Sequence, residues 1–110
     1  MTETRRNSRA LCSDFVRIAW IDNRLRRHCS VGLLEDVSPG GMCVALGASV
    51  PLELNVLVQA PGLSLMAAVR HCERGNYGYL VGLEFLGGHL WDKAKWRPKH
   101  LLEMPSGAQP

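Results

Sequence analysis

Residues 15–35 read FVRIAWIDNRLRRHCSVGLLE, and this stretch decides the fold because apolar and polar side chains alternate on both sides of a turn. Period-two spacing over residues 15–21 is typical of a β-strand, and it places three apolar side chains on one face: Val16, Ile18 and Trp20. Asp22-Asn23 favours a turn, because both side chains bond readily to nearby backbone groups. Residues 26–35 then return as a second strand through Cys29, Val31 and Leu33. The stretch predicts an antiparallel hairpin.

The downstream sequence repeats this pattern of short apolar runs between turn residues. Further strands are predicted at residues 42–46, 50–60, 65–72 and 79–86. Turns are predicted at Ser38-Pro39-Gly40-Gly41, Pro61-Gly62 and Glu73-Arg74-Gly75-Asn76. In residues 50–60 the apolar face is expected to hold Leu52, Leu54, Val56 and Val58. Six short strands without intervening helices predict a mainly β protein, a small closed or nearly closed antiparallel barrel.

The two ends of the chain differ from this pattern. Residues 1–13 are expected to form a flexible, arginine-rich arm, since they show no hydrophobic periodicity. Residues 88–104 mix leucine and tryptophan with basic residues and predict a C-terminal helix that is interrupted or restarted at Pro98. Residues 105–110 are expected to be a disordered tail. One barrel domain with its C-terminal helix, residues 14–104, is therefore expected between an arm and a tail.

Length and composition limit the class of protein. A chain of 110 residues permits one domain, and 46% hydrophobic with 21% charged residues is the composition of a globular protein. No apolar run approaches the ~20 residues needed to span a bilayer, and no signal segment follows the polar N-terminus, so a cytoplasmic location is expected. Residues 1–30 carry seven arginines against three acidic residues, whereas the rest of the chain sums to −1. The positive charge that attracts an anion is therefore concentrated in the first 30 residues.

The sequence offers little for catalysis or metal binding. Four cysteines lie too far apart for a CxxC metal or redox motif: Cys12, Cys29, Cys43 and Cys72. His28-Cys29 and His71-Cys72 supply zinc-like ligand types, but neighbouring residues on a strand face opposite sides, so each dipeptide offers one ligand to a shared metal. No nucleophile motif, phosphate loop or carboxylate pair is present. The sequence predicts neither an enzyme nor a metal or cofactor site.

Two short motifs carry the binding chemistry. The first is Arg5-Arg6-Asn7-Ser8-Arg9, and the second is Asp36-Val37-Ser38-Pro39-Gly40-Gly41 on a predicted turn. Guanidinium groups donate planar, paired hydrogen bonds to phosphate oxygens, while a carboxylate accepts from the two adjacent N–H donors on the Watson–Crick edge of guanine. Together the motifs indicate a site for an anionic guanine nucleotide.

This ordered pair, RxxxR followed by DxSxxG, resembles the motif pair of the PilZ family of bacterial cyclic di-GMP receptors. Arg5 and Arg9 fill the first motif, and Asp36, Ser38 and Gly41 fill the second. Family domains are also built of short strands and often close with Gly-x-x-Phe, which residues 82–85 match. The resemblance covers residues 5–86 and implies a stand-alone, single-domain PilZ protein.

The resemblance implies that cyclic di-GMP is the ligand, with Arg5 and Arg9 on its phosphates or guanine bases. Asp36 is expected to accept hydrogen bonds from guanine N1–H and the exocyclic amine, and Ser38 to add a hydroxyl contact. Gly40 and Gly41 are expected to allow close backbone approach and torsions that other residues avoid. The secondary candidates for ligand contacts are Arg6, Gly40, Arg70 and His71.

The implied function is that of a receptor whose arm becomes ordered on binding and which signals to an unidentified effector protein. Motility, attachment, exopolysaccharide production and virulence are the outputs that the resemblance implies. No membrane insertion and no general nucleic-acid binding are expected.

Alternatives remain open. Each motif alone also has a simpler explanation. The first can be a solvated basic arm, and the second can be a turn whose aspartate caps its own backbone. A PilZ-like adaptor without nucleotide binding would act through protein contacts alone. A barrel for single-stranded nucleic acid would need aromatic platforms along a basic groove, whereas three tryptophans lie in segments with core-like patterns: Trp20, Trp91 and Trp96.

Overall fold

Six strands form a closed antiparallel barrel in the computed structural model, which describes residues 10–87 and the side chains of residues 14–87. The strands are β1 (Ala10–Ile21), β2 (Arg27–Ser38), β3 (Gly41–Leu46), β4 (Asn55–Ala60), β5 (Leu63–Gly75) and β6 (Gly78–Phe85). The predicted mainly β, six-stranded barrel is therefore confirmed. Most of the predicted arm, the C-terminal helix and the tail lie outside the described residues.

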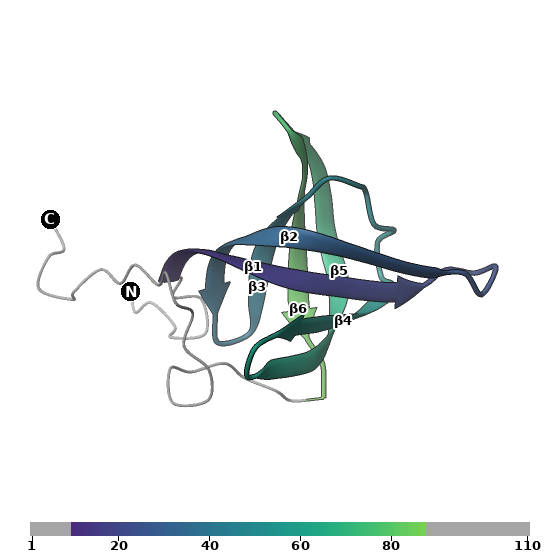
Figure 1. Ribbon diagram of the computed structural model, residues 1–110, viewed down its shortest axis with the longest axis horizontal. Coiled ribbons are helices and arrows are strands. Elements are labelled where there is room, and N and C mark those ends of the chain that lie inside the picture. The colour runs from purple at the N-terminus through teal and green to yellow at the C-terminus, as the bar shows by residue number, and fades with distance from the viewer. Residues whose placement is uncertain (1–9, 88–110) are drawn as a thin grey trace, which may run out of the picture.

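Around the barrel the strand order is β1-β2-β3-β6-β5-β4, and β4 closes the barrel against β1. Figure 1 shows β1 and β2 crossing the barrel as a long hairpin, while β5 and β6 run steeply past them. The closing ladder is the shortest within the described residues: Arg17 pairs with Gln59, Ile18 with Val58 and Ala19 with Leu57. We call this β1–β4 contact the seam. Beyond it the two strands diverge.

The core is made of the inward faces of all six strands, and more than half of its buried side chains are valines. Branching at Cβ suits valine to a pleated surface, and closure of the sheet leaves room for only one compact layer of side chains. The buried core residues are Val16, Ile18, Leu34, Val37, Met42, Val44, Leu46, Val50, Val56, Val58, Ala67, Val69, Val81, Leu83 and Phe85.

The inward face of β2 differs from the prediction. Cys29 is exposed and Val31 is 60% exposed, whereas Leu34 and Val37 are fully buried. Leu34 pairs with the buried Val44, so the even-numbered side chains before this point face the core and the odd-numbered ones face outward. Asp36 then pairs with Cys43, which leaves Glu35 as an extra residue and moves the inward position to Val37. A bulge of one residue changes which side chains face inward on its two sides.

Three predicted boundaries also move. β1 begins at Ala10, so it includes the last four residues that the sequence assigned to the arm. The strand predicted from residue 50 begins at Asn55 instead, because Leu52 and Glu53 form a turn in which Leu52 is 59% exposed and Glu53 has a φ of 66°. The last hairpin turns at Asn76-Tyr77 rather than within residues 73–76, because the polar residues before it continue the ladder.

Candidate functional site

A groove with a volume of about 690 Å³ crosses four neighbouring strands, β2, β3, β6 and β5. Its lining includes six residues that the sequence analysis singled out: Asp36, Ser38, Gly40, Gly41, Arg70 and His71. We call it the motif groove. The barrel thus brings the second motif and both β5 candidates to one surface, while Arg5, Arg6 and Arg9 lie outside the described residues.

The second motif lies on a tight connection, as predicted. Ser38 and Gly41 pair across the β2–β3 hairpin, and only Pro39-Gly40 lies between them. The Ser38 hydroxyl donates to the Gly41 carbonyl oxygen at 3.3 Å. The Phe85 amide donates to the Gly40 carbonyl oxygen at 2.9 Å, so the end of the Gly-x-x-Phe segment holds the turn in place.

The two glycines of this turn have different environments. A Cβ on Gly41 would lie 2.1 Å from the Leu83 carbonyl oxygen, whereas a Cβ on Gly40 would have no neighbour within 4 Å. Neither residue is among the described glycines with a positive φ. The expected close approach is therefore found at Gly41, against β6, but the expected unusual torsions are found at neither glycine.

Ladder irregularities flank the groove on both sides. Glu35, directly before Asp36, is the extra residue between β2 and β3, and the β1–β2 register also shifts opposite it. In β5, Val69 pairs with Leu83 and His71 with Gly82, which makes Arg70 the extra residue of a second bulge. Because bulges re-aim side chains, both irregularities help to set the directions of the groove's polar groups.

Arg70 is held by two carboxylates. Its Nε donates to Glu84 Oε1 at 2.7 Å, and its terminal nitrogen donates to Glu53 Oε1. The hydrogen bond that Arg70 donates to Glu84, followed by the charge of Glu53, raises the pKa of the Arg70 guanidinium above its ordinary value. Arg70 therefore remains a cation at every physiological pH, but its charge is already balanced.

The groove as described is acidic. Four carboxylates line it, those of Glu35, Asp36, Glu73 and Glu84, against one guanidinium and the His71 imidazole, whose Nε2 lies 3.4 Å from Glu73 Oε1. Among the described residues, the side chains that line the groove therefore include more carboxylates than cations.

The start of β1 lies beside the second motif. Leu11 pairs with Asp36 and Ala10 with Val37, so the chain enters the barrel next to the motif's aspartate. Because consecutive Cα atoms are about 3.8 Å apart across a trans peptide, Arg9 is attached within one residue of this position. The first described residue of the chain, Ala10, therefore lies beside the second motif.

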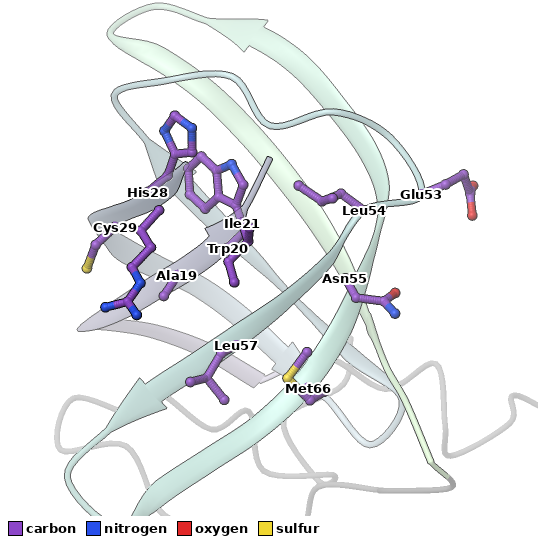
Figure 2. Close-up of a pocket in the computed structure, with 11 residues that line it drawn as sticks. Ala19, Trp20, Ile21, His28, Cys29, Glu53, Leu54, Asn55, Leu57 and Met66 are labelled. Carbon is purple, nitrogen blue, oxygen red and sulfur yellow. The ribbon is translucent and has the colours of Figure 1, made fainter. Parts of the chain in front are cut away.

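A second, more apolar cavity of about 770 Å³ lies where β1 and β4 diverge beyond the seam, and we call it the seam cleft. Figure 2 shows the stacked Trp20 and His28 rings on one side, Leu54 opposite them, and Leu57 and Met66 on the adjoining strands. The two ring centroids are 5.1 Å apart at 9° between planes. Trp20, which the sequence assigned to the core, is half-buried and packs against the core from this cleft.

Sequence reasoning did not identify the carboxylates around Arg70 or the seam cleft. Glu84 lies inside the Gly-x-x-Phe segment, and its outward direction follows from strand alternation, so that signal was available. The Glu53 contact and the cleft had no comparable signal, because both depend on where strands distant in sequence pair.

In the part of the chain that the structure describes, no three histidine, cysteine or acidic side chains come together as a metal site. Among the same residues, no helix has the length and apolarity to cross a membrane. No protein-family model, curated protein or solved structure matches the chain. Function is therefore inferred from its own residues and geometry.

Proposed function

We propose that this protein is a PilZ-type receptor that binds cyclic di-GMP in the motif groove, and that it is not an enzyme. One observation carries the proposal. The Asp-x-Ser-x-x-Gly turn lines the groove, and β1 begins beside that turn with Ala10 paired to Val37. Since Arg9 directly precedes Ala10 in sequence, this arrangement supports a shared site for the two motifs, as joint recognition of phosphate and base requires.

The charge of the groove gives the arginines a specific task. The carboxylates that line the groove outnumber its cations, and an excess of negative charge opposes a ligand with two phosphates, so Arg5, Arg6 and Arg9 are proposed to supply the compensating cations. A carboxylate is also suited to recognition of guanine, because that of Asp36 can accept hydrogen bonds from the two adjacent N–H groups of the base. The Ser38 hydroxyl donates its hydrogen bond to the Gly41 carbonyl oxygen, so the Ser38 oxygen is left as an acceptor for the exocyclic amine of guanine.

Binding would then bring the N-terminal arm onto the barrel beside the groove. An arm clamped only when the ligand is present changes the surface offered to an effector protein. The bacterial outputs that the resemblance implies would follow from that effector.

Calorimetric titration with cyclic di-GMP, alongside GTP and cyclic GMP, tests the proposal. We expect micromolar or tighter binding of cyclic di-GMP alone. Arg9→Ala and Asp36→Ala should each lose at least about tenfold in affinity, since hydrogen bonds to charged groups contribute about 1.5–3 kcal/mol. Arg74→Ala is the matched control, because Arg74 is exposed and lines neither the groove nor the seam cleft. Absence of heat at near-millimolar ligand would exclude the receptor.

A second candidate is the PilZ-like adaptor that binds no nucleotide. The observation that favours it is the paired state of Arg70, whose charge is already balanced by Glu53 and Glu84. The same titration distinguishes the adaptor from the receptor, because an adaptor gives no heat with any of the three nucleotides. For an adaptor, Asp36→Ala also leaves this result unchanged.

A further inference from the structure

The seam cleft has the shape and chemistry of a docking surface. It is concave, and its wall is mainly apolar, with Trp20, Leu54, Leu57 and Met66 among its residues. Ile21 and Met66 are 55% and 41% exposed, so part of this apolar surface faces solvent. Contiguous apolar surface around a concave site is typical of places where a partner inserts anchoring side chains.

The rim of the cleft carries positive charge that is not balanced. Arg27 lines the cleft, and Arg24 and Arg26 precede it in the turn at the tip of the β1–β2 hairpin, which Figure 1 shows projecting from the barrel. No salt bridge among residues 14–87 involves these three arginines. The nearby carboxylates are engaged elsewhere, Asp22 with its own turn and His28, and Glu53 with Arg70.

We infer that the seam cleft docks a partner protein through an acidic, amphipathic segment. Apolar side chains of that segment enter between Trp20 and Met66, and its carboxylates pair with the arginines of the hairpin tip. Charge complementarity favours an acidic segment as the occupant. Apolar side chains that lose their contact with water on binding provide affinity, while opposite charges fix the register of the segment and raise its association rate.

Other occupants match the surface less well. A second copy related by a two-fold axis would bring two arginine-rich hairpins toward each other. Residues 88–104 carry four lysines or arginines against two acidic residues, so their charge has the same sign as that of the rim. A flat lipid surface would reach the hairpin tip but not the concave lining. The inference stands without cyclic di-GMP binding.

Selection of random 12-residue peptides by display on the full-length chain tests the inference. We expect the enriched peptides to be acidic, with apolar residues interspersed. As synthetic peptides they should lose at least about tenfold in affinity for Ile21→Glu and for Arg27→Glu. They should bind Arg74→Glu as they bind the unaltered chain, since that matched charge reversal lies outside the cleft. Thermal melting of each variant verifies that it is folded.

Enriched peptides without an acidic bias, or ones that ignore both cleft substitutions, would overturn the inference, as would a selection that enriches nothing. Two further outcomes would reassign the surface. A dimer in sedimentation that Ile21→Glu dissociates would make a second copy the occupant. An empty selection on the unaltered chain, followed by enrichment of peptides on the Trp91→Ser, Trp96→Ser variant, would show that the chain's own C-terminal segment fills the cleft.

Discussion

Gly40 and Gly41 are adjacent in sequence, yet only Gly41 lies against another strand. An alanine Cβ at Gly41 would lie 2.1 Å from the Leu83 carbonyl oxygen, and a backbone atom cannot move aside without disturbing the β3–β6 ladder. We expect Gly41→Ala to lower the free energy of unfolding by about 1–3 kcal/mol, as overpacking does elsewhere. Gly40→Ala should change it by no more than about 0.5 kcal/mol.

Urea denaturation of both variants measures the difference. Equal midpoints for Gly40→Ala and Gly41→Ala would contradict the steric role and leave ligand contact as the reason for glycine at position 41. If Gly41→Ala has the lower midpoint, Gly41 is required for the stability of the barrel, whether or not it contacts a ligand. The ligand affinity that calorimetry gives for Gly41→Ala would then be corrected for the fraction of protein that is unfolded.

The location of single residues was predictable where one turn determines it. Asp36, Ser38, Gly40 and Gly41 are recognisable in sequence as turn residues, and the structure places them on the β2–β3 connection. The direction of Arg70 was not predictable, because it is an extra residue in a ladder between two strands. Whether a residue pairs or bulges depends on the partner strand, which the local sequence does not contain.

At the scale of elements, Asp22 organises the turn of the β1–β2 hairpin. One carboxylate oxygen accepts from the Arg24 and Arg26 amides at 2.8 and 2.9 Å, and the other lies 2.8 Å from His28 Nε2. The His28 hydrogen bond, followed by that of the Arg26 amide, lowers the pKa of Asp22 below its ordinary 3.8. The charged form therefore holds the turn together.

The sign of the pH effect follows from this shift. A carboxylate with a lowered pKa in the folded state stabilises that state above its ordinary pKa, and the contribution is lost as pH falls through the lowered value. We expect the Arg24 and Arg26 amide resonances to shift together in NMR spectra only below pH 3.8. In Asp22→Asn this transition should disappear. A transition well above that pH would show that another group controls the turn.

The elements themselves were largely predictable, but their inward faces were not. β2 has apolar residues on both faces, Val31 on one and Leu34 on the other, so alternation alone could not show which side meets the core. The even-numbered pattern from Leu52 to Val58 was continuous in sequence, yet Leu52 is exposed in a turn and only the later positions join β4. Such choices depend on barrel closure, a long-range property.

At the scale of the whole molecule, one set of ion pairs spans the distance between the two cavities. Arg70 and Glu84 line the motif groove, while Glu53 belongs to the loop that lines the seam cleft, and Arg70 binds both carboxylates. In Figure 2 the Glu53 side chain points away from the cleft. Arg70 therefore both neutralises Glu53 and holds its carboxylate away from the place where we infer that an acidic segment docks.

This arrangement predicts antagonism between the two ligands. If a phosphate of cyclic di-GMP draws Arg70 from its carboxylates, Glu53 becomes an unbalanced negative charge near the cleft and opposes an acidic partner. We expect saturating cyclic di-GMP to lower the affinity of a cleft-selected peptide by roughly two- to fivefold, the range of energies of exposed ion pairs. By linkage, the peptide must lower the affinity for cyclic di-GMP by the same factor.

Titration of the peptide with and without cyclic di-GMP, and the reverse titration, measures this coupling. Glu53→Gln should abolish it, because no charge is then released when Arg70 moves. Glu73→Gln is the matched control, since Glu73 lines the same groove but is paired with His71 rather than with Arg70. Equal peptide affinity in both states of the unaltered chain would mean that the cavities act independently. Coupling that survives in Glu53→Gln would assign it to the N-terminal arm instead, which enters the barrel at the other end of β1.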